Sequence, residues 1–305
     1  MDEVNAYSLA LILNEGSFSC VKASKALGFV SHDALTRQLL KDWSFSPVAD
    51  WSTLPKQGVV VIDDTVIAKP HSQAIEGVKW QYASSQNKVL PGINMLLALW
   101  VVGETNYILD VLFPGDENRN DLVQDLLNRV KKEGFEPEKI LFDGWYAASK
   151  TLNLIHTLGW TYICRGRGNR LFEGQPIESH AFYGAKGLTG KLKGVYQRVQ
   201  IVKHGDRYLL TNDLTPHTSR SLAECYAERW VVETVFRDLK HVLHLEKCSC
   251  RNSDQQFNHA LCALEAYLYL RKTFPSLSVE AAQQEFLRSH RCPHCRPDLT
   301  QLVRA

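Results

Sequence analysis

Gly58-Val-Val-Val-Ile-Asp-Asp-Thr-Val-Ile67 is the stretch that decides the fold of this chain. Its β-branched run is typical of a strand buried on both faces, and two adjacent aspartates interrupt it. A carboxylate inside such a strand costs free energy unless it is paired or binds a metal ion. Asp63 and Asp64 are therefore candidate functional residues on a predicted central strand.

Apolar runs after this strand predict the rest of a mixed sheet. Two of the expected strands form an antiparallel meander with residues 58–67. Strands are expected at residues 95–102, 106–113, 139–143 and 160–164, and helices at 120–132, 147–158, 257–273 and 279–289. From the first strand onward, the order β-β-β-α-β-α-β is that of an RNase H-like sheet and differs from a doubly wound dinucleotide fold. The predicted fold class is α/β: an RNase H-like mixed β-sheet core flanked by helices, with a small β-rich insertion and a helical N-terminal region.

Residues 226–240 contain no Pro or Gly and are predicted to form one helix. At about 100° per residue, Tyr226, Arg229, Glu233 and Lys240 fall within a ~60° arc at the edge of an apolar face. For a charged helix taken alone, solvated ion pairs along the rim explain such a stripe. A site that uses the charges is the alternative, and it needs partners elsewhere in the chain.

Asp143 supplies one such partner, because it ends the strand predicted at residues 139–143. In an RNase H-like sheet this strand lies beside the first one, so Asp143, a first-strand aspartate and Glu233 can converge. Three carboxylates without histidine suit Mg²⁺ or Mn²⁺. Two such ions about 4 Å apart activate a water or a 3′-OH for phosphodiester chemistry. For Asp143 alone, capping of a turn is the alternative interpretation.

The charge distribution is more informative than the total. The 305 residues are 45% hydrophobic and 22% charged, as in a soluble globular protein, and the net charge of +2 identifies no partner. Residues 165–207, however, carry nine basic and three acidic side chains, a local charge of +6. Such a segment suits a polyanion, although a solvated basic loop explains it equally well.

The N-terminal residues do not resemble a secretory signal, and the longest apolar run, at residues 95–102, is too short to span a bilayer. We therefore expect a cytoplasmic protein without a membrane partner. Its eight cysteines are expected to be reduced thiols.

Three motifs, in this order, resemble the DDE transposases of the bacterial insertion-sequence group that carries the Tyr-Arg-Glu-Lys signature. They are Ile62-Asp-Asp-Thr65, Leu141-Phe-Asp-Gly-Trp145 and Tyr226-x₂-Arg229-x₃-Glu233-x₆-Lys240. The resemblance covers about residues 58–245. It implies an RNase H-like core with a β-rich insertion between the second aspartate and the glutamate, where the basic segment lies.

By this resemblance, Asp64, Asp143 and Glu233 are the catalytic carboxylates that bind two Mg²⁺ (or Mn²⁺) ions per active site. Asp64 is preferred to Asp63 because the family's aspartate directly precedes threonine, and the pleat sends the two side chains to opposite faces. The residues expected to bind DNA are Tyr226, Arg229, Lys240, Arg165, Arg167, Lys191 and Lys193.

The implied function is that of a transposase that binds terminal inverted repeats, cleaves phosphodiester bonds at the element ends and transfers 3′-OH ends to target DNA. Such an enzyme is expected to act as a homodimer on paired DNA ends, in the cytoplasm and associated with the nucleoid. The alternatives are an element-derived DNA-binding or regulatory protein without cleavage, and an RNase H-like nuclease without strand transfer.

Five segments are predicted along the chain. They are a helical N-terminal DNA-binding candidate (1–55), the first part of the core (56–165), a basic β insertion (166–210), the second part of the core (211–275) and a C-terminal helical tail (276–305). Helices at 19–28 and 31–40 resemble a helix-turn-helix, with a packing hairpin as the alternative. Cys248, Cys250, Cys292 and Cys295 are candidate zinc ligands, because Cys-x₂-Cys is a common ligand spacing, with free thiols as the alternative.

Overall fold

The computed structural model of the protein describes residues 4–40, 48–72, 74–83, 87–183, 186–291 and 299–303. Its contacts divide the chain into two compact units. The sheet unit comprises residues 48–64 and 95–233, and the helical unit comprises residues 1–47, 65–94 and 234–305. Three elements cross from one unit into the other: β1 (Gln57–Ala68), β3 (Lys88–Val102) and α7 (Trp230–His241).

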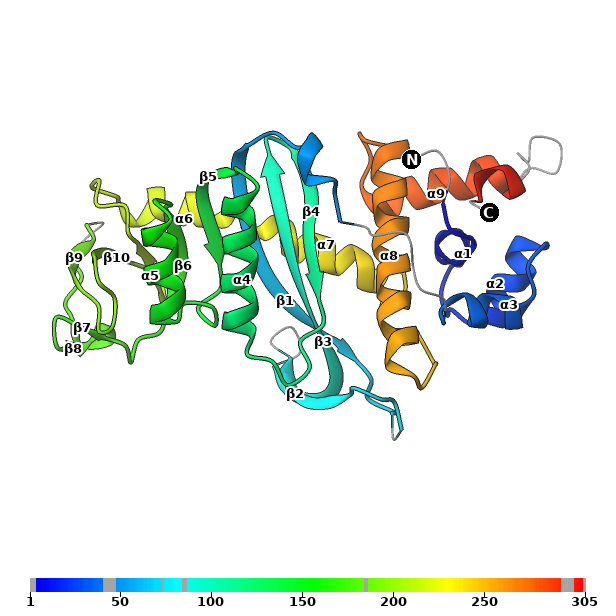
Figure 1. Ribbon diagram of the computed structural model, residues 1–305, viewed down its shortest axis with the longest axis horizontal. Coiled ribbons are helices and arrows are strands. Elements are labelled where there is room, and N and C mark those ends of the chain that lie inside the picture. Colours follow the sequence, from blue (N-terminus) through cyan, green and yellow to red (C-terminus); the bar gives the residue numbers. More distant parts are fainter. Residues whose placement is uncertain are drawn as a thin grey trace. The chain divides into compact units, whose positions relative to one another are not determined.

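A mixed sheet forms the centre of the sheet unit (Figure 1). Its first five strands lie in the order β4-β3-β1-β5-β6, with β4 at Thr105–Leu112, β5 at Glu136–Phe142 and β6 at Tyr162–Gly166. β3 and β4 are antiparallel, whereas β5 is parallel to both β1 and β6. This is the strand order of an RNase H-like sheet, so the predicted fold class is confirmed.

The segment that follows β6 extends the same sheet. β11 (Arg207–Thr211) pairs antiparallel with β6, β10 (Arg198–His204) with β11, and β9 (Leu188–Lys191) with β10. β7 (Leu171–Phe172) and β8 (Gln175–Pro176) form a small separate pair, followed by a 3₁₀ turn at Ile177–Ser179. The predicted insertion is thus β-rich, and three of its strands continue the core sheet. The five predicted segment boundaries stay predictions.

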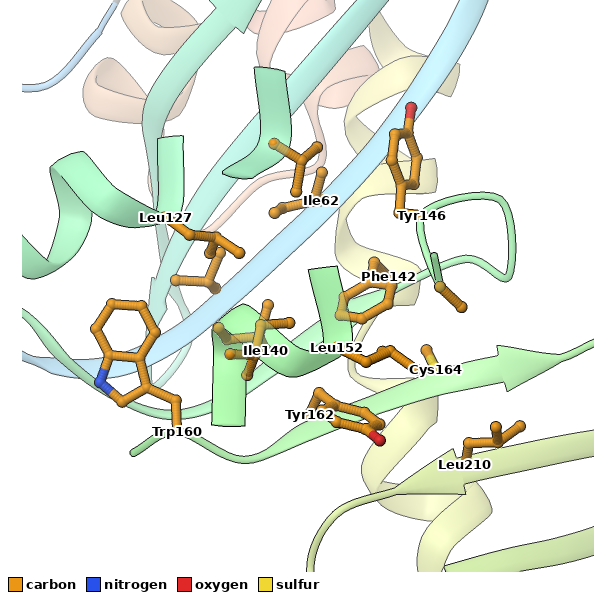
Figure 2. Packing of buried hydrophobic residues seen from close by; sticks show 14 of the residues in the cluster. Ile62, Leu127, Ile140, Phe142, Tyr146, Leu152, Trp160, Tyr162, Cys164 and Leu210 are labelled. Atoms are coloured by element: carbon orange, nitrogen blue, oxygen red, sulfur yellow. The ribbon is translucent and has the colours of Figure 1, made fainter. Parts of the chain in front are cut away.

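The hydrophobic core of the sheet unit lies between the sheet and two helices, α4 (Arg119–Lys132) and α5 (Ser149–Thr157). Ile62 of β1 and Phe142 of β5 belong to one buried cluster with Leu127 of α4 and Leu152 of α5 (Figure 2). Burial of these apolar side chains is the main stabilising contribution to the unit. It also holds in place the strand ends that carry the aspartates.

The prediction of a single helix over residues 226–240 was wrong. Instead, α6 (Ser219–Ala227) ends just after Tyr226, and α7 begins at Trp230. Between them the backbone N–H of Arg229 donates to the carbonyl of Tyr226, 3.1 Å away and three residues back, which interrupts the α-helical pattern. Tyr226 and Glu233 therefore do not share one continuous helical stripe. No Gly or Pro marks this break, and tertiary contacts of Arg229 override local propensity.

The helical unit contains α1 (Ala6–Leu13), α2 (Cys20–Leu27), α3 (His32–Gln38), α8 (Ser253–Thr273) and α9 (Val279–Arg291). Gly28 ends α2 in the left-handed region at φ 80°, which confirms the predicted helix end. β2 (Lys79–Ala83), which was not predicted, pairs antiparallel with the first part of β3. Short 3₁₀ turns lie at Trp51–Thr53 in the sheet unit and at Leu299–Leu302 in the helical unit. Across the described ranges, every helix is too short or too polar to cross a membrane.

Among the described histidines of the helical unit, His259 has the pKa that lies furthest from the ordinary value of a histidine. Its Nε2 donates to the His244 carbonyl at 2.9 Å, so Nδ1 accepts from the Tyr7 hydroxyl, also at 2.9 Å. Burial lowers the pKa of His259 to about 3.

We predict that the helical unit loses stability as the pH falls from about 6.5 towards 3, because the unfolded chain then binds a proton that folded His259 rejects. The slope contributed by this group is about 1.4 kcal/mol per pH unit. Urea unfolding at a series of pH values measures it. The His259→Gln variant should show a shallower slope, and parallel slopes for the two proteins would contradict the prediction.

Candidate active site

Asp63 and Asp143 meet where β1 and β5 run side by side. The parallel register pairs Ile62 with Phe142, so each aspartate is the next residue after a paired position. The Tyr146 N–H donates to the Asp143 carbonyl at 3.0 Å, which closes a tight turn after β5. The charge of Asp143 also acts on Asp63. The end of β5 therefore presents two carboxyl groups close together.

Arg229 brings a third carboxylate to this place. Its Nη1 donates to Asp63 and its Nη2 donates to Glu233, which lies one turn further along α7. The guanidinium also lies over the Tyr226 ring, 5.4 Å from its centre. Its Nε is buried and has no hydrogen-bond partner among the described residues. Arg229 thus bridges two carboxylates and keeps one donor unused.

For Asp63 and for Arg229, burial and the charge of the other residue shift the pKa in opposite directions. Burial raises the pKa of the Asp63 carboxyl to about 7, although Arg229 works in the opposite direction, and Asp64 and Asp143 add to the rise. Burial alone would lower the pKa of the Arg229 guanidinium, but the neighbouring acidic groups, Asp63 first among them, raise it overall. One guanidinium faces several carboxyl groups, so the cluster favours an additional cation.

Asp64 points to a different set of partners. Its Oδ2 accepts from Arg119 Nη1 at 3.0 Å, and its Oδ1 accepts from the Tyr146 hydroxyl at 2.5 Å. The Tyr146 side chain is completely buried. The structure therefore brings Asp143 and Glu233 together around Arg229 with Asp63, and it places Asp64, the aspartate expected from the sequence, in a separate hydrogen-bonded group.

The remaining two residues of the predicted signature have internal partners. The Tyr226 hydroxyl lies 3.4 Å from the Phe142 carbonyl, and burial raises the pKa of this hydroxyl. In the helical unit, Lys240 Nζ donates to the Val66 carbonyl at 2.8 Å and forms an ion pair with Glu246 at 3.1 Å. Their predicted contacts with DNA stay predictions.

The surface of the sheet unit carries four exposed cations that were expected to bind DNA: Arg165, Arg167, Lys191 and Lys193. Beside Arg167, Trp145 is 54% exposed directly after the Asp143-Gly144 pair. The Arg167 and Arg119 guanidinium groups lie 5.2 Å and 5.9 Å from its ring centre. Sequence reasoning did not single out Trp145, although its position two residues after Asp143 was a usable signal.

The donor chemistry of the cluster fits Mg²⁺ or Mn²⁺, since it offers carboxylate oxygens and surplus negative charge. In the part of the chain that the structure describes, no three His, Cys, Asp or Glu side chains are arranged to hold a metal ion. Arg229 lies between Asp63 and Glu233 and supplies the positive charge there. A metal site at this place therefore requires the guanidinium to move.

The candidate zinc ligands are only partly within the described residues. Cys248 is buried, Cys250 is half-buried, and a hydrogen bond from Cys248 lowers the pKa of the Cys250 thiol to about 7. Cys292 and Cys295 lie outside the described residues. Zinc binding stays a prediction.

Residues 54–269 match the family model described as Transposase DDE domain. No curated protein sequence matches the chain. Among solved structures, the Drosophila P element transposase strand transfer complex is similar over 93% of this chain, with 13% sequence identity and a TM-score of 0.28. The chain spans 63% of the length of that chain.

Proposed function

Since the chain belongs to the family of transposase DDE domains, we propose that it is a DNA transposase. We further propose that it is a member of the Tyr-Arg-Glu-Lys group of bacterial insertion sequences. It binds terminal inverted repeats, cleaves phosphodiester bonds at the element ends and transfers the 3′-OH ends to target DNA. The observation that carries the proposal is the gathering of Asp143, Glu233 and a β1 aspartate around Arg229 at the end of β5.

Asp143, Glu233 and the β1 carboxylate hold divalent metal ions in this proposal. Bound Mg²⁺ or Mn²⁺ supplies the activation of a water or 3′-OH and neutralises charge on the phosphate. Arg229 then donates to a phosphate oxygen of the DNA backbone. Its unpaired Nε, together with a terminal nitrogen, offers the two parallel donors that a phosphate accepts.

The exposed cations of the sheet unit hold the DNA backbone. Arg165 and Arg167 lie in and just after β6, while Lys191 and Lys193 lie in and just after β9. Contacts of this kind are independent of base sequence and weaken as salt concentration rises. Tyr226 and Lys240 support the same backbone near the cut. Two chains act together on paired ends, in association with the nucleoid.

An assay with end-containing DNA, Mg²⁺ and a supercoiled target tests the proposal against its alternatives. Joined products support transposition. Nicks without joining indicate a nuclease without strand transfer, and a mobility shift without nicking indicates a DNA-binding or regulatory protein.

Gly144→Ala should reduce cleavage by about a hundredfold, because a misplacement of about 1 Å at a reacting group has this effect. A Cβ atom at Gly144 would lie 2.7 Å from the Arg165 carbonyl oxygen, so the turn that holds Asp143 must shift. Gly115→Ala is the matched control, since nothing lies within 4 Å of its Cβ position. Initial cleavage rates on end DNA measure the effect, and equal rates for the two variants would refute the prediction.

A further inference from the structure

We propose that Asp63, and not its neighbour Asp64, is the β1 carboxylate that binds the catalytic metal ions. The catalytic role rests on the proposed function, whereas the choice between the two aspartates rests on the geometry of β1. Sequence resemblance pointed to Asp64 because a threonine follows it, but the two side chains leave the strand in opposite directions.

The alternation of β1 assigns the two aspartates to different faces. Val60 and Ile62 belong to the buried cluster formed with α4 and α5, and Asp64 continues this set at every second residue. Consistently, Arg119, the partner of Asp64, is the first residue of α4. Asp63 lies on the opposite face, where Arg229 precedes α7.

Asp63 shares its face with the other two carboxylates of the site. Arg229 bridges it to Glu233, and Asp143 follows the register partner of Ile62 on the neighbouring parallel strand. In parallel strands, side chains at matching register positions point to the same side of the sheet. Three oxygen-donor side chains from β1, β5 and α7 therefore face one place, and that place already holds a cation.

Asp63 accepts from the Arg229 guanidinium and, at 2.9 Å, from the backbone N–H of Asp64, whereas both side-chain oxygens of Asp64 accept from other side chains. One accepts from Arg119 and the other accepts from the buried Tyr146 hydroxyl. Turning Asp64 towards a metal would leave that buried hydroxyl without its acceptor, which is unfavourable. Asp64 is thus a positioning residue: it ties the start of α4 to the turn that follows Asp143. The side-chain partner of Asp63 is a guanidinium, whose positive charge a bound metal ion can replace.

The test compares Asp63→Asn with Asp64→Asn, two substitutions of equal shape and charge change. Mn²⁺ affinity is measured on the full chain without DNA, by electron paramagnetic resonance of free Mn²⁺. Loss of a direct ligand should weaken binding by more than the roughly 10–100-fold that outer partners contribute. We therefore expect more than about 100-fold weakening for Asp63→Asn and about 10-fold, the low end of the range for outer partners, for Asp64→Asn.

Two further measurements keep the test decisive. Tyr146→Phe breaks the hydrogen bond to Asp64 and keeps the charge, so it serves if Asp64→Asn does not fold, and it should bind Mn²⁺ as the unmodified chain does. Asp63→Cys should cleave end DNA with Mn²⁺ but not with Mg²⁺, because a thiolate is a poor ligand for Mg²⁺.

The inference is overturned if Asp64→Asn loses Mn²⁺ affinity while Asp63→Asn keeps it, if both lose it equally, or if neither does. Normal Mn²⁺ affinity in Asp63→Asn alone also overturns it. A chain that binds Mn²⁺ through Asp63 but never cuts DNA would instead contradict the proposed function and leave the metal assignment standing.

Discussion

Asp143→Asn and Glu233→Gln should each reduce cleavage of end-containing DNA by about a thousandfold or more. Both carboxylates face the Arg229 cluster, and each substitution replaces a carboxylate, proposed above as a metal ligand, by a neutral amide of the same shape. Metal ions contribute several kcal/mol of transition-state stabilisation, and about 4 kcal/mol corresponds to a thousandfold in rate. Single-turnover cleavage in Mg²⁺ measures the loss.

DNA binding provides the internal check for these two variants. A mobility shift with end DNA should persist, because exposed cations such as Arg165 and Lys191 remain. Asp206→Asn is the matched control, since this carboxylate is 90% exposed and makes a long contact of 3.9 Å to Arg207. Normal cleavage by Asp143→Asn or by Glu233→Gln would remove that residue from the active site.

Phe142→Ala should lower the free energy of unfolding by about 3–5 kcal/mol, the range for deleting a buried phenylalanine ring. Phe142 is completely buried at the end of β5, and its ring centre lies 6.3 Å from that of Tyr162 (Figure 2). Removal leaves a cavity that the surrounding sheet and helices fill only in part. Denaturant unfolding without metal measures the change.

Two other substitutions serve as controls for Phe142→Ala. Phe142→Leu keeps most of the apolar volume and should lose clearly less stability. Tyr196→Ala removes an aromatic ring that is 85% exposed, so its effect should stay within about 0.5 kcal/mol. A loss for Phe142→Ala no larger than that of Tyr196→Ala would contradict the packing described for the end of β5.

The strands could be predicted from the sequence because their signal is local. The run at residues 58–67 became β1, and the predicted strands at 95–102 and 106–113 lie within or close to β3 and β4. Continuous β-branched runs and short apolar stretches have few other stable arrangements. β2 was not predicted, since Lys79–Ala83 shows no comparable apolar run. It lies at an edge of the sheet, where most of its side chains are exposed and do not need to be apolar.

The helix break and the fate of the basic segment could not be predicted in this way. Nothing in residues 226–240 disfavours a helix locally, yet Arg229 lies in a turn where it reaches both Asp63 and Glu233. Likewise, β9, β10 and β11 join the core sheet through the edge of β6. Pairing between segments that are distant in sequence depends on which strand of the folded sheet has an edge with unpaired backbone groups. Local sequence patterns do not indicate which strand that is.

The sequence by itself determined the class of fold, the strand that carries the aspartates and the family to which the chain belongs. The tertiary structure alone decided which carboxylates face one another, placing Asp63 with Glu233 at Arg229 and Asp64 with Tyr146. The physical reason is the two-residue period of a strand. Neighbouring side chains point to opposite faces, and only the packing of helices on those faces gives each aspartate its partners.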